Sequence, residues 1–234
     1  MKTKIVRKRL FPCEAALTAA ILLNSLTLCL LVKSSFGIST LSSVPLALSK
    51  IFTSISLGTW TTVIQTATVL LLIFITKQPR IGYFFSFLVA IIFGFFVDID
   101  THMMLSWSLL LPWKICYFLI GFIGMAFGAS LFIKCRLPIT PFDLFVRDLS
   151  RYSGKNIKLV KTTYDFICVA LTITLSLSFL HKIVGIGIGT ILGMIFTGTI
   201  TQFFVKKLDS YFIFVPVTKT GKFLVKITEI SKKS

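Results

Sequence analysis

The chain has 234 residues, of which 55% are hydrophobic and 14% charged, with a mean hydropathy of +0.92. A soluble domain carries about 25% charged residues, so this composition excludes one, and the surplus of apolar side chains requires lipid around it. The net charge of +17 would suggest nucleic acid in a soluble protein. The basic residues lie between apolar runs, however, and no nucleic-acid-binding motif is present. Topology and contact with anionic lipids explain the charge better, and we expect no nucleic acid partner.

Five of the first nine residues are basic, and an apolar run from about 11 to 32 follows them. This run is too long for the apolar region of a signal peptide, and no small-residue cleavage site follows it. We therefore expect a retained first span.

Apolar runs of about 20 residues predict six membrane-spanning helices. They lie at 12–32, 57–76, 81–97, 113–133, 159–180 and 184–205. We accordingly divide the chain into a basic N-terminus (1–11), a first three-helix repeat (12–97), a loop (98–112), a second three-helix repeat (113–205) and a basic tail (206–234).

The distribution of basic residues predicts the orientation of the spans. With an even number of spans, 21 of the 25 Lys and Arg residues fall on the side of the termini. The other side keeps only Lys33, Lys50, Lys114 and Lys182. Because basic loops stay in the cytoplasm, we expect a multi-pass plasma-membrane protein whose N- and C-termini are both cytoplasmic.

The two halves of the chain resemble each other. A shift of 101 residues, without gaps, places Lys33 on Lys134, Leu48-Ser49-Lys50 on Leu149-Ser150-Arg151, and Thr61-Thr62 on Thr162-Thr163. Each half has three spans, an odd number, so the second half enters the membrane in the opposite direction. This arrangement is an inverted-topology repeat, which is common in secondary transporters. The predicted fold class is an all-α integral membrane protein with two such repeats.

Each repeat also contains a short amphipathic or re-entrant helix, at 38–52 and 140–153. The second begins with Thr140-Pro141 and a carboxylate at Asp143, which together are typical of a helix N-terminus. Asp143 and Arg147 then lie one turn apart on a polar face. Such a helix either rests on the membrane surface or enters a water-filled cavity, and the sequence leaves both open.

Two motifs bring a family to mind. The segment Leu-Pro-Ile-Thr-Pro-Phe-Asp-Leu-Phe-Val-Arg-Asp-Leu-Ser at 137–150 resembles the Pro-x-Asp segment of YczE/YitT-type bacterial membrane proteins, and Gly-Ile-Gly-Ile-Gly-Thr-Ile at 185–191 resembles their Gly-x-Gly-Thr element. The resemblance covers roughly residues 12–205 and includes the duplicated plan. It implies a bacterial multi-pass membrane protein from a largely uncharacterised family.

Glycines at helical spacing predict close helix packing, because backbones approach where side chains are absent. Gly185, Gly189 and Gly193 recur every fourth residue in the last span, and Gly124 and Gly128 do so in the fourth. Contact of this bare backbone with a ligand is the alternative.

Polar residues within the spans are candidates for contact with a solute or a coupling ion. Asn24 lies in the first span, Gln65 in a stripe with Gly58, Thr61 and Thr68, and Asp165 in the fifth span, one turn after Lys161. Interhelical hydrogen bonding and an interfacial Lys–Asp pair are the alternative explanations.

The sequence contains no recognisable catalytic motif, and its five cysteines form no C-x-x-C pair. We therefore expect no enzyme, no cofactor and no metal site. The architecture favours a transporter-like protein that moves or binds an unknown small solute. The alternatives are a non-transporting accessory or assembly protein and a substrate-binding subunit of a multi-component importer, with a second membrane protein or another copy of the chain as partner.

Overall fold

A computed structural model describes residues 9–77, 81–135, 140–219 and 221–222. Four parts of the chain discussed above lie outside these ranges. They are the basic residues before position 9, most of the turn at 77–80, the start of the 137–150 motif and the last part of the tail.

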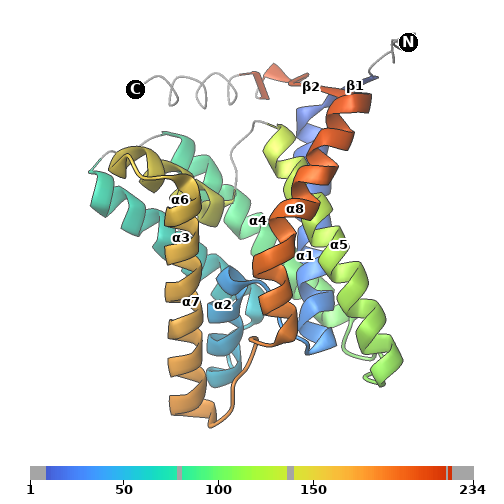
Figure 1. Cartoon of the computed structure of the whole chain (residues 1–234), viewed down its shortest axis with the longest axis vertical. Helices are drawn as coiled ribbons and strands as arrows, with labels where there is room; N and C mark the ends of the chain where they lie inside the picture. Colours follow the sequence, from blue (N-terminus) through green and yellow to red (C-terminus); the bar gives the residue numbers. More distant parts are fainter. Residues whose placement is uncertain (1–8, 78–80, 136–139, 220, 223–234) are drawn as a thin grey trace.

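The described residues form eight helices and two short strands (Figure 1). In chain order these are β1 (Arg9–Pro12), α1 (Cys13–Ser34), α2 (Thr40–Ile51), α3 (Leu57–Thr76), α4 (Ile81–Met103), α5 (Leu111–Cys135), α6 (Pro141–Ser153), α7 (Ile157–Leu180), α8 (Ile188–Tyr211) and β2 (Phe212–Val215).

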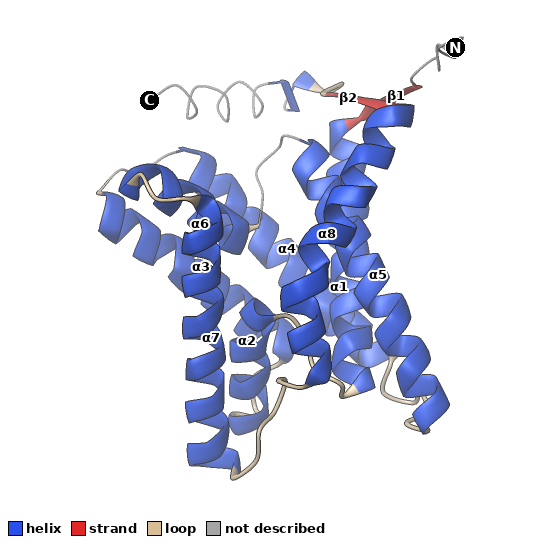
Figure 2. Ribbon diagram, in the orientation of Figure 1, coloured by secondary structure: helices blue, strands red, loops and turns tan. Residues whose placement is uncertain are grey.

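Six of the described helices are long and apolar enough to cross a membrane: α1, α3, α4, α5, α7 and α8. The six-span prediction is thereby confirmed at the level of length and composition. Figure 2 shows that the described residues are mostly helical, with loops between the helices and one strand pair at one end.

The helices pack into two groups (Figure 1). The larger hydrophobic core joins α1, α4 and α5 through residues such as Leu28, Phe93 and Phe132, and α8 packs along α5. The second core joins α3, α6 and α7 through residues such as Leu72, Phe145 and Val160, and α2 packs against α3 and α7. The α3–α4 hairpin connects the two groups.

The third span is longer than its apolar run indicates. Helix α4 continues past residue 97 to Met103, and the carboxylate of Asp98 has a structural role there. It accepts hydrogen bonds from Ser56 Oγ at 2.6 Å and from the backbone N–H of Gly58 at 2.7 Å. Asp98 therefore caps the N-terminus of α3, where a negative charge is stabilising.

A parallel strand pair joins the segment before α1 to the segment after α8. β1 pairs with β2 from Arg9 and Phe212 to Pro12 and Val215. Beside it, the Glu14 carboxylate accepts hydrogen bonds from Val217 N at 3.2 Å, Thr218 N at 2.9 Å and Thr218 Oγ1 at 2.7 Å. We call the strand pair together with these bonds the terminal clasp. No periodicity in the sequence had indicated it.

The order of helix lengths occurs twice along the chain. α1 to α4 and α5 to α8 each run long, short, long, long. The 101-residue shift places Thr40, the first residue of α2, on Pro141, the first residue of α6. In Figure 1, α6 lies toward the end that carries the strand pair, and α2 lies nearer the opposite end.

Candidate functional site

Polar side chains meet where the short helix α2 packs along α7. Thr40 Oγ1 donates a hydrogen bond of 2.6 Å to Asp165 Oδ1. The other carboxylate oxygen, Oδ2, lies 3.5 Å from Lys161 Nζ, one turn earlier on α7. Asp165 is only 8% exposed, whereas the Lys161 side chain is 56% exposed. The buried carboxylate thus takes its closest hydrogen bond from α2 and not from the lysine.

Hydroxyl groups continue this contact along α7. Ser43 Oγ lies 2.8 Å from Thr172 Oγ1, and both residues are fully buried. Ser176 follows one turn later, is also fully buried, and its Oγ has no hydrogen-bond partner among the described residues. We call these five residues the α2–α7 seam: Thr40, Ser43, Asp165, Thr172 and Ser176.

The first turn of α2 is the positive end of a helix. Ser39 caps it, its Oγ accepting from Ser42 N. A carboxylate beside a helix N-terminus is stabilised by the helix dipole and by the free N–H groups. The Thr40–Asp165 contact therefore places the negative charge of Asp165, on α7, at the N-terminus of α2, which attracts it.

An extended segment before α2 holds this helix in place. The backbone N–H of Ile38 donates to Gly185 O at 3.0 Å, and Gly189 N donates to Phe36 O at 2.8 Å. Gly37, with φ +116°, lies where a Cβ atom would be 2.6 Å from Thr190 Oγ1. This position therefore requires glycine, and the start of α8 fixes the start of α2.

A second polar face lies on α3. Thr68 Oγ1 is 3.1 Å from the hydroxyl of Tyr164, the neighbour of Asp165 on α7. Gln65 is 2% exposed, and its Oε1 has no hydrogen-bond partner among the described residues. A buried amide oxygen without a partner is costly, so it marks a position where water or a ligand would be stabilised.

The first turns of both short helices reach the same pair of residues on α7. Asp165 contacts Thr40 of α2. Tyr164 has its ring centroid 6.5 Å from that of Phe142, in the first turn of α6, and 4.8 Å from that of Phe145. Tyr164 and Asp165 therefore connect the beginnings of α2 and α6.

The remaining sequence candidates lie elsewhere. Asn24 donates to Ala20 O at 2.7 Å and lies between α1 and α5, directly against Gly128. Asp143 is exposed and accepts a hydrogen bond of 2.7 Å from Thr140 Oγ1 at the start of α6. None of the described contacts connects Asn24 or Asp143 with Asp165.

Arg147 pairs with Asp148, its neighbour in the sequence, and not with Asp143 one turn earlier. Its Nε lies 2.7 Å from Asp148 Oδ1, and Arg151 approaches the same oxygen at 3.8 Å. Asp148 is 3% exposed, so the two arginines neutralise a buried charge on α6.

The glycines in the candidate set differ in their surroundings. A Cβ atom on Gly124 would lie 2.6 Å from Thr27 Cγ2, and one on Gly189 would lie 2.5 Å from Phe118. Gly185, with φ +79°, belongs to the turn before α8, while Gly193 would make only ordinary contacts, the nearest at 3.7 Å. The spacing of four residues alone could not separate these cases.

Sequence reasoning singled out Asp165 but not its partners in the seam. Thr172 and Ser176 follow Asp165 by seven and eleven residues, which places all three on one face of a helix. That spacing was a usable signal. No signal in the sequence indicated the contribution of α2, because Thr40 and Asp165 are 125 positions apart.

The chemistry that these groups can perform is limited. The seam offers one carboxylate, an adjoining ammonium group and hydroxyls, which suit a proton or a small polar solute. Among the described residues, no group of three or more His, Cys, Asp or Glu side chains could hold a metal ion.

A family model matches residues 13–206, which covers all of the α2–α7 seam and stops short of β2. The chain belongs to DUF6198, a family of unknown function. No curated protein and no solved structure matches it. In this DUF6198 chain, the clasp partners Arg9–Pro12 and Phe212–Val215 lie outside the matched segment.

Proposed function

We propose that this protein is a transporter-like protein of the plasma membrane, and not an enzyme, that binds and moves a small polar solute along the α2–α7 seam. One observation carries the proposal. A carboxylate and four hydroxyl groups are buried in a row between two helices, and the last hydroxyl, on Ser176, lacks a partner in the described part of the chain. Buried polar groups are costly within a membrane and mark functional positions there.

The arrangement of the helices supports an inverted repeat. α2 of the first half packs against α7 of the second, and α6 of the second half packs against α3 of the first. The two short helices lie toward opposite ends of the molecule (Figure 1). In transporters with inverted repeats, the ends of discontinuous helices form the substrate site near the middle of the membrane. We take α2 and α6 to be such re-entrant helices.

The orientation follows from the charges. The side with both termini carries most of the Lys and Arg residues, so we place the termini in the cytoplasm. Lys161 and Asp165 then lie in the cytoplasmic part of α7, and Thr172 and Ser176 lie toward the outside.

Asp165 is the residue to which we assign coupling. Its charge holds Thr40 and attracts Lys161. Protonation or solute binding would weaken both contacts, because each depends on a negative carboxylate. The first turn of α2 would then be free to move relative to α7, which would open the seam.

The first experiment identifies the solute and then measures its transport. Purified protein is heated with a panel of amino acids, organic acids, sugars and cations, and compounds that raise its melting temperature are tested for uptake into proteoliposomes. Asp165→Asn keeps the shape of the side chain and removes the charge, so we expect loss of uptake with the fold retained. Asp209→Asn is the matched control, because Asp209 is 55% exposed and pairs with Lys134 on the surface. Undiminished uptake by Asp165→Asn would remove Asp165 from the mechanism.

A second function is favoured by α8. Its large apolar side chains are broadly exposed, including Ile188 at 73% and Ile195 at 61%. Such a face suits lipid, but it also suits another membrane protein, as expected of an accessory protein or an importer subunit. A stoichiometric partner that copurifies in mild detergent and is lost on Ile195→Arg would favour this function over transport.

A further inference from the structure

The two oxygens of the Asp165 carboxylate are held in different ways. Thr40 Oγ1 donates a hydrogen bond of 2.6 Å to Oδ1, and both residues are buried. Lys161 Nζ lies 3.5 Å from Oδ2, but the lysine side chain is largely exposed. An exposed i, i+4 ion pair is weak. The lysine ammonium can therefore leave Oδ2 while Thr40 keeps the carboxylate in place.

Any group that replaces the Lys161 ammonium has to be positively charged. Without a cation, Asp165 is a buried charge that lacks its ion partner, which is costly within a membrane. The positive end of α2 amounts to only about half a charge, so it does not replace a full cation. A neutral solute would leave the carboxylate uncompensated, and an anion would be repelled.

The lysine also indicates the kind of cation. Its side chain is a primary ammonium group on an unbranched alkyl stem, and the structure shows that this group fits beside Asp165 Oδ2. Thr40 Oγ1 donates its proton to Oδ1 and keeps lone pairs that can accept from an ammonium N–H. A divalent metal ion needs more ligands than these, and the described residues contain no group of three or more His, Cys, Asp or Glu side chains that could hold one.

We propose that the solute is a small primary ammonium ion that takes the place of the Lys161 ammonium at Asp165. This inference rests on the transport function proposed above and adds the class of the solute. Lys161 is then a tethered competitor, which neutralises Asp165 until a solute arrives. Because a tethered group competes at a high effective concentration, removal of the lysine ammonium increases the affinity for a free one.

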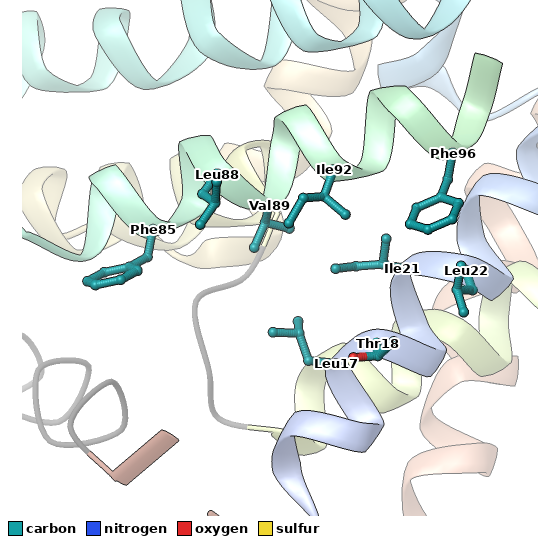
Figure 3. Close-up of a pocket in the computed structure, with 9 residues that line it drawn as sticks. All are labelled: Leu17, Thr18, Ile21, Leu22, Phe85, Leu88, Val89, Ile92 and Phe96. Carbon is teal, nitrogen blue, oxygen red and sulfur yellow. The ribbon is translucent and has the colours of Figure 1, made fainter. Parts of the chain in front are cut away.

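An apolar groove between α1 and α4 provides a contrasting surface. Its volume is about 220 Å³, and Thr18 is the one polar residue among the nine that line it. Figure 3 shows these side chains projecting from both helices into the space between them. A groove lined in this way has no charge to offer an ammonium ion. Ile92→Trp, which places a larger side chain in the groove, is therefore a control that should leave ammonium binding unchanged.

The test compares probes of similar size and different charge. Ethylammonium chloride, ethanol, sodium acetate and potassium chloride are added to purified protein in detergent, at an ionic strength held constant with sodium chloride. The dependence of the melting temperature on probe concentration gives the apparent Kd. We expect ethylammonium alone to stabilise the wild type, and we expect Asp165→Asn to lose this response.

Two lysines of α7 form a matched pair of variants. Lys161→Gln should bind ethylammonium about twofold more tightly, which is the factor that corresponds to one i, i+4 ion pair. Lys158→Gln removes an equal charge from an exposed position in the first turn of α7 and should leave the apparent Kd unchanged.

Equal stabilisation by ethanol, acetate or potassium would overturn the inference. So would an ethylammonium response that persists in Asp165→Asn, unchanged binding in Lys161→Gln, or the absence of any response in both wild type and Lys161→Gln. Uptake into proteoliposomes separates the inference from transport itself. Asp165-dependent uptake of an anionic or neutral solute would overturn the ammonium class and retain transport, whereas the expected binding without uptake of radiolabelled ethylamine would support the ammonium site and contradict transport.

Discussion

Thr40 and Asp165, 125 positions apart in the chain, are joined by a hydrogen bond of 2.6 Å between the hydroxyl of one and the carboxylate of the other. Because Thr40 is the first residue of α2, this bond fixes the start of the short helix α2 to the N-terminal half of the long helix α7. It therefore connects the first half of the chain to the second at a buried charge.

Removing the Thr40 hydroxyl tests this connection. Thr40→Val keeps the shape of the side chain but leaves Asp165 Oδ1 without its donor, so we expect a loss of about 1–3 kcal/mol in the free energy of unfolding. Thr40→Ser retains the hydroxyl and should lose much less. Denaturant unfolding in detergent micelles measures both. Equal stability of wild type and Thr40→Val would mean that the carboxylate is satisfied by water.

Close packing between α1 and α5 gives a second prediction. Gly128 lies directly against the amide of Asn24, so Gly128→Leu should lower the stability by about 1–3 kcal/mol through overpacking. Gly198 on α8 is the control, because a Cβ atom there would meet nothing within 4 Å. Melting temperatures of Gly128→Leu and Gly198→Leu in detergent compare the two sites, and a larger loss at position 198 would contradict the helix contact.

The terminal clasp gives a third prediction. The amide in Glu14→Gln offers one acceptor oxygen and no charge where the carboxylate accepts several bonds, so the segment after β2 should be held less firmly. Gly221→Ala should act in the same way, because its Cβ would collide with Glu14. We expect trypsin to cleave faster after Lys219 and Lys222 in both variants, as read by mass spectrometry of the fragments. Unchanged cleavage would show that the strand pair alone holds the segment.

The orientation gives a fourth prediction. In a cysteine-free background, Ser108→Cys in the α4–α5 loop and Ser153→Cys at the end of α6 are both exposed positions. An impermeant thiol reagent applied to intact cells should label only position 108. Permeabilised cells provide the control, in which both should react. Labelling of position 153 from outside would reverse the charge-based assignment and would remove the support for an inverted repeat.

Hydropathy was sufficient to locate the spanning helices, because a span must be continuously apolar. The 57–76 run coincides with α3, from Leu57 to Thr76. The ends of other helices depended on contacts that hydropathy does not report. α4 continues through Asp98, whose charge is satisfied by Ser56 and Gly58.

The last helix, α8, begins later than its apolar run indicates. The apolar run suggested a start near 184, but α8 begins at Ile188. The residues before it form an irregular turn, in which Gly185 O accepts a hydrogen bond from Ile38 N, and Gly189 N in the first turn of α8 donates to Phe36 O. A contact between segments about 150 residues apart leaves no periodic pattern, and the contribution of α2 to the α2–α7 seam escaped prediction for the same reason.

The terminal clasp also has a consequence for biosynthesis. Glu14 leaves the ribosome before Val217 and Thr218, which follow it by 203 and 204 positions. During translation, Glu14 therefore lacks these partners until the last span, α8, has been made. A chain truncated before β2 can form neither the strand pair nor the bonds to Glu14, so the clasp closes only after β2 and residues 217–218 have been synthesised.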